Sequence, residues 1–171
     1  MVRKLLLGLI LLVFLLGCNS KDEVDSPIYK GKFLDIGVIG ESPDVREQNV
    51  NFQRITFDKL KSTTPTDHDA IFIMKEYLEQ AGENQYAHVY KQLDIPVFFI
   101  QSTQAYLPFI LDDLTYKEST FNVDQTYATG IISQDDGFNT WGYGLYNDTE
   151  NETNVRDVYT RIFTTIEAEL R

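Results

Sequence analysis

The chain has 171 residues, of which 43% are hydrophobic and 13% aromatic, so it can fill the core of one domain. Of its 15 basic and 26 acidic residues, Arg3 and Lys4 lie in an N-terminal segment expected to be removed, which leaves 13 basic residues and a net charge of −13. A body this acidic repels phosphate backbones, which argues against nucleic-acid binding.

The N-terminus has the pattern of an export signal. Arg3 and Lys4 precede twelve almost wholly apolar residues, 5–16, which are too short to span a hydrocarbon core of about 30 Å. The segment ends in Leu15-Leu16-Gly17-Cys18, which resembles the lipobox of bacterial lipoproteins. The resemblance implies attachment of a diacylglyceryl group, with palmitate-type acyl chains, to the sulfur of Cys18. It also implies cleavage just before Cys18, the one cysteine of the sequence.

This resemblance divides the chain into three parts. Residues 1–17 are expected to be a signal peptide, 18–27 a lipidated cysteine with a flexible polar tether, and 28–171 a globular domain. The mature protein would be lipid-anchored at the outer face of the bacterial cell membrane. The alternative is an ordinary secretory signal with an incidental cysteine, but Leu15 stands where such a signal needs a small residue.

The first elements of the domain are expected between residues 33 and 57. Phe33–Ile39 has the pattern of a strand. Ser42-Pro43-Asp44 follows and carries the signals of a helix start, with an N-cap serine, a proline at the first position and an acid in the first turn. We expect that helix to end near Asn49 and a second strand to occupy Val50–Phe57.

Residues 69–102 predict the centre of the fold. Ala70–Met74 and Ile95–Ile100 are short apolar runs typical of strands covered on both faces. The segment between them has helical spacing that is interrupted at residues 82–84, which indicates two helices or one broken helix. A strand, a crossover of about twenty residues and a second strand make a βαβ unit, so the two strands should be parallel neighbours.

The last third of the chain predicts a hairpin and a helix. Tyr106–Leu111 is apolar but contains a proline, which indicates a buried loop or an edge element. Tyr127–Ile132 and Thr140–Tyr146 are expected to pair as a hairpin, because Asp136-Gly137 between them is a strong turn signal. The final element is an amphipathic helix, whose apolar face comprises Val155, Val158, Tyr159, Ile162, Phe163 and Ile166.

Together these patterns predict one α/β domain. It should contain a mixed sheet with a parallel βαβ centre, an antiparallel hairpin added at one side, and helices packed on the sheet.

Two short motifs contain residues that bind metals or phosphates in other proteins. Asp67-His68-Asp69 contains candidate metal ligands, but a zinc site needs further ligands at suitable spacing, so a hydrogen-bonded strand start is the simpler interpretation. Residues 37–42 combine glycines with a helix start but do not complete a nucleotide-binding fingerprint. We therefore predict no metal and no cofactor.

Two further motifs lie near the C-terminal helix. Residues 148–152 are acidic, and they fit the N-terminal charge of a helix better than a calcium loop. Trp141–Tyr146 alternates aromatic residues with glycines. That pattern indicates either an aromatic platform for a wall sugar or peptide, or core aromatics with a helix packed on the glycine face.

A ligand site is expected at the carboxyl ends of the parallel strands, where crossovers diverge and leave a crevice. These ends are Gly40-Glu41-Ser42 after the first strand and Gln101-Ser102-Thr103 after the strand at 95–100. The hypothesis is that Ser42, Ser102 and Thr103 hydrogen-bond a small polar ligand.

The function predicted from these observations is that of a membrane-anchored extracytoplasmic lipoprotein with a non-catalytic binding or accessory domain. Its expected partners are the membrane, through Cys18, and an envelope protein or a small polar ligand. The alternatives are a surface-anchored enzyme acting on cell-envelope material and a structural or immunity-type accessory to another membrane protein. Polar groups gathered at the strand ends would favour a binding protein or an enzyme, whereas a large exposed apolar patch would favour the accessory.

Overall fold

The computed structural model describes Val24 and residues 26–120, 126–135 and 137–170. The expected signal peptide, Cys18 and the first part of the expected tether lie outside these residues, as does Asp136 of the hairpin turn. Within the described ranges, no helix combines the length and apolarity needed to cross a bilayer.

The described residues form one mixed sheet in the order β2-β1-β3-β4-β5-β6. Strands β2, β1, β3 and β4 are parallel, while β5 is antiparallel to both β4 and β6. The strands are β1 Leu34–Ile39, β2 Val50–Arg54, β3 Ala70–Ile73, β4 Val97–Ile100, β5 Ala128–Gln134 and β6 Gly137–Tyr143. The predicted α/β fold, with its parallel centre and added hairpin, is confirmed.

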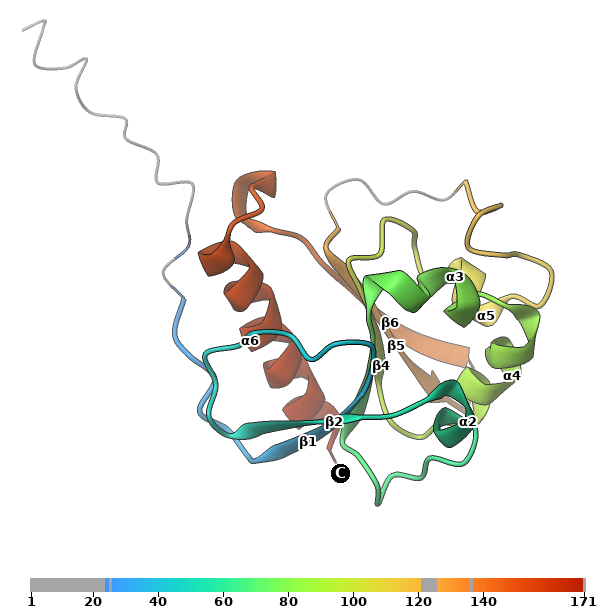
Figure 1. Ribbon diagram of the computed structural model, residues 1–171, viewed down its shortest axis with the longest axis horizontal. Helices are drawn as coiled ribbons and strands as arrows, with labels where there is room; N and C mark the ends of the chain where they lie inside the picture. The colour runs from blue at the N-terminus through green and yellow to red at the C-terminus, as the bar shows by residue number, and fades with distance from the viewer. Residues whose placement is uncertain (1–23, 25, 121–125, 136, 171) are drawn as a thin grey trace, which may run out of the picture.

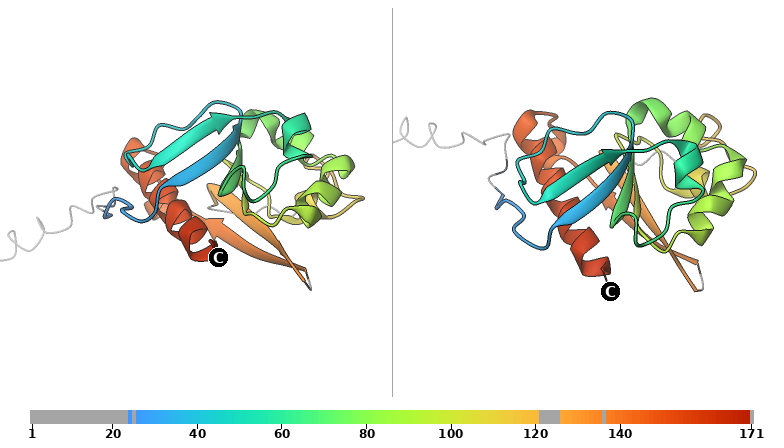
Figure 2. Two further views of the ribbon diagram at one scale, coloured as in Figure 1. Left: turned by 90° about the horizontal axis from the view of Figure 1, so that it is seen from below. Right: turned by 60° about the horizontal axis from the view of Figure 1, so that its bottom comes forward.

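Helices cover both faces of the sheet. One face carries α2 to α5, and the other carries the single long helix α6 (Figures 1 and 2). The helical elements are α2 Phe57–Leu60, η2 Lys75–Tyr77, α3 Leu78–Ala81, α4 Asn84–Gln92, α5 Leu107–Ile110, η3 Tyr146–Asp148 and α6 Glu152–Glu169. The predicted break at residues 82–84 separates α3 from α4.

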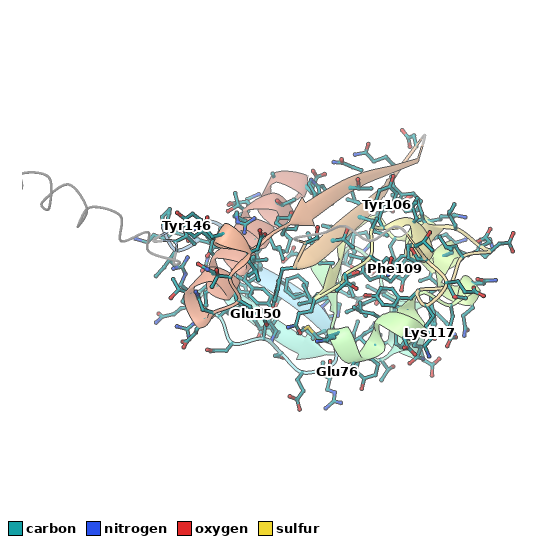
Figure 3. All side chains as sticks on the ribbon, turned by 90° about the horizontal axis from the view of Figure 1, so that it is seen from above. Glu76, Tyr106, Phe109, Lys117, Tyr146 and Glu150 are labelled. Carbon is teal, nitrogen blue, oxygen red and sulfur yellow. The ribbon has the colours of Figure 1, made fainter. Side chains whose placement is uncertain are left out.

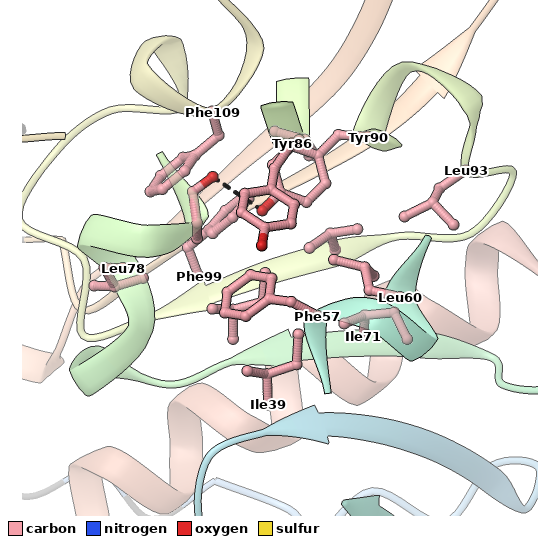
Figure 4. Close-up of a cluster of buried hydrophobic side chains, with 14 of the residues drawn as sticks. Ile39, Phe57, Leu60, Ile71, Leu78, Tyr86, Tyr90, Leu93, Phe99 and Phe109 are labelled. Atoms are coloured by element: carbon pink, nitrogen blue, oxygen red, sulfur yellow. Dashed lines mark hydrogen bonds between the residues drawn. The ribbon is translucent and has the colours of Figure 1, made fainter. Parts of the chain in front are cut away.

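The core beneath α2 to α5 is rich in aromatic side chains (Figure 4). Phe99 of β4 stacks on Phe109 of α5, with ring centroids 3.5 Å apart and planes inclined by 4°. Tyr90 of α4 is buried, and its hydroxyl donates to the carbonyl oxygen of Ala81 at 3.1 Å. The predicted loop or edge element at 106–111 is therefore a short helix instead, begun by Pro108 and fixed by the burial of Phe109.

The core beneath α6 confirms the predicted C-terminal helix. Phe72 of β3 lies parallel to Phe163 of α6, with centroids 6.3 Å apart, and Ile162 is fully buried. Asn151 caps the helix, because its side chain accepts a hydrogen bond from the backbone of Asn154 at 2.8 Å. Glu152 occupies the first turn, as the interpretation of the acidic segment 148–152 expected.

The helix predicted from Ser42 to Asn49 is absent, and the chain there is an irregular connection between β1 and β2. Side chains of this connection bind α6 instead of forming a local helix. Asp44 accepts a hydrogen bond from Arg156 at 2.6 Å, and Arg46 donates to Thr160 at 3.1 Å. These tertiary contacts outweigh the local capping signals of Ser42 and Pro43.

Only the first half of Trp141–Tyr146 belongs to the sheet, because β6 ends at Tyr143 and not at Tyr146 as expected. Tyr143 is buried beneath α6, and Trp141 stacks on Phe98 at 6.0 Å. Trp141 and Tyr143 therefore pack in the core and do not form an exposed platform, whereas Tyr146 lies beyond β6 and is exposed. The expectation that a helix covers the glycine face is wrong, since a Cβ atom added to Gly142 would meet no atom within 4 Å.

Candidate functional site

A cleft of about 190 Å³ opens at the carboxyl edge of the parallel strands. Figure 3 looks onto this edge, with Tyr146 and Glu150 on the side of α6 and Phe109 on the side of α5. The residues that line the cleft are Lys75, Gln101, Thr103, Thr126, Tyr127, Leu145, Asp148 and Glu150.

Segments of three connections, β3–β4, β4–β5 and β6–α6, meet in this cleft because of the strand directions. Lys75 directly follows Met74 after β3, and Gln101 directly follows β4. Tyr127 precedes β5, which is antiparallel to β4, so its amino end lies at the same edge as the carboxyl end of β4. Glu150 belongs to the connection from β6 to α6, which returns across this edge.

Backbone strain is concentrated around the cleft. Among the described non-glycine residues, positive φ angles occur at Gln101 (57°), Asn147 (47°) and Asp148 (53°). Two of these residues line the cleft and the third precedes Asp148. Left-handed non-glycine residues are costly and gather at binding and catalytic sites, so this clustering marks the cleft as a candidate site.

The cleft presents charges of both signs. Lys75 is exposed, and within the described residues no ion pair joins it to a carboxylate. Asp148 and Glu150 supply carboxylates to the same cleft, and Gln101 Nε2 donates to Glu150 Oε1 at 3.4 Å. A ligand here would meet a cation and carboxylates together with the apolar side chain of Leu145.

Tyr127 links the cleft to the core below it. Its ring lies edge-on to Tyr159 of α6, with centroids 6.4 Å apart. Burial raises the pKa of the Tyr127 hydroxyl, and a hydrogen bond with Tyr159 partly opposes that shift. Tyr127 therefore stays protonated at neutral pH and can donate a hydrogen bond to a ligand.

The structure places the three predicted ligand-binding residues at one edge but not in one site. Thr103 lines the cleft, whereas Ser42 is exposed and lines neither this cleft nor the second pocket described below. Ser102 is fully buried, and its hydroxyl donates to the carbonyl oxygen of Gln104 at 3.0 Å, as expected of a turn residue. Strand β3 lies between β1 and β4 and separates the two predicted segments.

The crevice expected at the carboxyl end of β1, beside Gly40, is partly filled by the side chain of Met74. Gly40 has a φ of +126°, and a Cβ atom added to it would lie 2.7 Å from the side chain of Met74. A second pocket of about 280 Å³ does open next to Gly40, toward Phe57 and Tyr86 on the α2–α5 face. This second pocket includes neither Ser102 nor Thr103.

The triplet Asp67-His68-Asp69 lies at the start of β3 and performs local structural roles. Asp67 accepts a hydrogen bond from the backbone of Thr64 at 2.9 Å, and Asp69 accepts one from the backbone of Asp35 at 2.7 Å. No cluster of three or more metal-ligating side chains occurs within the described residues. The interpretation as a hydrogen-bonded strand start agrees with these contacts.

Sequence reasoning missed Tyr127 and Glu150 because it considered only strands expected to be parallel. It missed Lys75 because it left out the carboxyl end of the strand expected at Ala70–Met74. The signal that could have found Tyr127 and Glu150 was the hairpin itself. If its first strand pairs antiparallel with β4, the residues before that strand and after the hairpin must lie at the carboxyl edge.

Comparison of the chain with protein-family models, curated protein sequences and solved structures gives no match. Function must therefore be inferred from the chemistry of the site.

Proposed function

We propose that this protein is a bacterial lipoprotein, anchored through Cys18 to the outer face of the cell membrane, whose α/β domain binds a small zwitterionic ligand without catalysis. The N-terminal sequence supports the anchor, and the mixed charge of the cleft supports the ligand class. The observation that carries the binding proposal is that Lys75, Asp148 and Glu150 line one cleft.

The chemistry of the lining residues defines the ligand. The ammonium group of Lys75 suits a carboxylate or phosphate group, while Asp148 and Glu150 suit a ligand ammonium group. Thr103 and Tyr127 offer neutral hydrogen bonds. A volume of about 190 Å³ suits a molecule of amino-acid size.

Catalysis is the less favoured alternative because no activated nucleophile occurs among the described residues that line the cleft. Ser102 lies next to the cleft, but its hydroxyl is used in a hydrogen bond to a backbone carbonyl and does not meet a base. The two histidines lie elsewhere: His68 is buried before β3, and His88 pairs with Asp112 at 3.8 Å.

Calorimetric titration of the lipidated protein in detergent tests the binding proposal. The probes are serine and phosphoethanolamine, each compared with an analogue that lacks the ammonium group. We expect Lys75→Met to weaken binding about tenfold or more, because a hydrogen bond to a charged group contributes about 1.5–3 kcal/mol. The matched control is Lys117→Met, since Lys117 is an exposed lysine that pairs with Glu79 at 2.7 Å outside the cleft.

Two results would contradict this proposal. One is the absence of measurable binding for every zwitterionic probe. The other is an equal effect of the Lys75 and Lys117 substitutions, which would show that the cleft cation does not contact the ligand.

A further inference from the structure

The chain before β1 is attached along the length of α6. We call Val24 and residues 26–32 the strap (Figure 1). The backbone of Val24 donates to Asn154 Oδ1 at 3.0 Å, near the start of α6, and the backbone of Lys32 donates to Glu167 Oε1 at 3.0 Å, near its end. Because α6 has 18 residues and is about 27 Å long, the strap runs parallel to most of the helix, in the same chain direction.

Two charged side chains, the partly buried Arg46 and the buried Glu47, hold the middle of the strap. Arg46 donates to Ser26 Oγ at 2.7 Å and to Thr160 Oγ1 at 3.1 Å. Glu47, only 5% exposed, accepts hydrogen bonds from the hydroxyl of Thr160 and from the backbone of Tyr29 at 3.4 Å. Moving the strap away would cost Arg46 its hydrogen bond to Ser26 and the buried Glu47 its hydrogen bond from Tyr29, which is unfavourable.

One buried asparagine joins the strap to a wall of the cleft. Asn154 is fully buried, and its Oδ1 accepts the hydrogen bond from Val24. Its Nδ2 donates to the carbonyl oxygens of Tyr146 at 3.2 Å and Thr149 at 2.8 Å. These carbonyls belong to the connection that contributes Glu150 to the cleft, so the strap begins at the edge of the sheet that holds the cleft.

The position of Val24 fixes which edge lies nearest the anchor. Five residues lie between Cys18 and Val24, so the six residue-to-residue steps that join them can span at most about 20 Å. The opposite end of α6 lies about 27 Å farther along the helix. We infer that the carboxyl edge, with the cleft and the connection 144–151, is the surface that faces the membrane. This inference rests on the proposed lipid attachment at Cys18.

Two properties of the molecule bear on this orientation. Tyr146 is 42% exposed at the carboxyl edge, and tyrosine suits the level of lipid head groups. The mature chain would carry a net charge of −13, so attraction to anionic lipids does not orient it. The short attachment of the strap is thus the orienting device.

The test uses the absence of cysteine other than Cys18 from the sequence. Tyr146→Cys provides a labelling site at the carboxyl edge, and Phe33→Cys provides a matched site directly before β1, at the other edge, where Phe33 is 60% exposed. Each full-length lipidated variant is labelled with a thiol-reactive fluorophore. It is then reconstituted into vesicles of phosphatidylethanolamine and phosphatidylglycerol that contain a lipid with a nitroxide on its head group. We expect quenching to be several-fold stronger at position 146 than at position 33.

A lengthened linker provides the control. About twenty Gly-Ser residues inserted between Cys18 and Val24 add a flexible span of about 25 Å, which should remove the difference in quenching while leaving vesicle flotation intact. Protein that fails to float with the vesicles would overturn both the anchor and this inference. Protein that floats but is quenched equally at both positions, or more strongly at position 33, would overturn this inference alone.

Discussion

Residue type predicts the strained backbone angles at some positions around the cleft but not at others. Asn147 and Asp148 belong to the types that most readily adopt left-handed backbone angles, so their positive φ values agree with their sequence. Gln101 directly follows β4 and has a φ of 57°, but its residue type gives no such signal. The strain at Gln101 could therefore not be predicted from residue type.

Because His68 is buried, we expect the free energy of unfolding to fall in mild acid. Its side chain is 4% exposed, and its Nδ1 has no hydrogen-bond partner among the described residues. Burial is the largest influence and lowers the pKa of His68 below its ordinary value of 6.5. The charged neighbours are Asp67, Asp35 and Asp69, which act to raise this pKa, and Lys59, which acts to lower it.

The sign of the effect follows from proton binding. Below about pH 6.5 the unfolded chain protonates His68 while the folded protein keeps it neutral, so the unfolded state binds more protons. The free energy of unfolding should therefore fall as pH decreases from 6.5 through the lowered folded pKa. Urea unfolding between pH 7.5 and 5 should show a smaller decrease in His68→Gln than in the parent protein. His88→Gln is the control, because the side chain of His88 is 70% exposed; an equal decrease in the parent protein and in His68→Gln would contradict the prediction.

At the scale of elements, prediction succeeded where the local pattern matches the final packing. The spacing of Val158, Ile162 and Ile166 predicted α6, and the structure buries all three side chains. Prediction failed for residues 42–49, where strong capping signals are present but Arg46 and Glu47 bind Thr160 of α6. Those partners lie more than 100 residues away in the sequence, so no local window contains the information.

The burial of α6 makes a testable prediction about stability. Ile162→Asp should lower the free energy of unfolding by about 4 kcal/mol or more, because it opens a cavity and buries an unpaired carboxylate. That loss is a large part of the roughly 5–15 kcal/mol typical of a domain, so the variant should unfold at a much lower urea concentration or fail to fold. Thr164→Asp is the control, because Thr164 is exposed on the same helix and its replacement should cost about 1 kcal/mol or less. Similar urea midpoints for the two variants would contradict the packing of α6.

For the whole molecule, the fold class could be predicted but the site could not be placed. The βαβ unit and the hairpin each have local signatures, and together they imply a mixed sheet. The strand order also depends on the edge at which each crossover returns, which those signatures do not specify. Lys75, Tyr127 and Glu150 meet only because β5 pairs with β4 and the chain then returns to α6. The cleft is a product of topology, and its residues share no sequence motif.

The net charge of the whole molecule and its proposed lipid anchor together determine how it is held at the membrane. With a net charge of −13 the mature protein is repelled by anionic lipids, so the proposed lipid on Cys18 must supply the whole attachment to the membrane. One acyl chain binds a membrane only marginally, at about 0.8 kcal/mol per buried methylene, whereas a diacylglyceryl group adds a second chain and holds firmly. High salt should therefore leave the protein in the membrane fraction, and detergent should release it.

Intact-mass measurement of the detergent-extracted protein identifies the attachment. We expect a chain that begins at Cys18 and carries a diacylglyceryl modification, and we expect Cys18→Ser to abolish both the modification and the cleavage. An unmodified protein that begins at another residue, or release of the parent protein by salt alone, would contradict the lipid anchor. Either result would point to an ordinary secretory signal, the alternative that Leu15 disfavours, since a signal of that kind requires a small residue at its position.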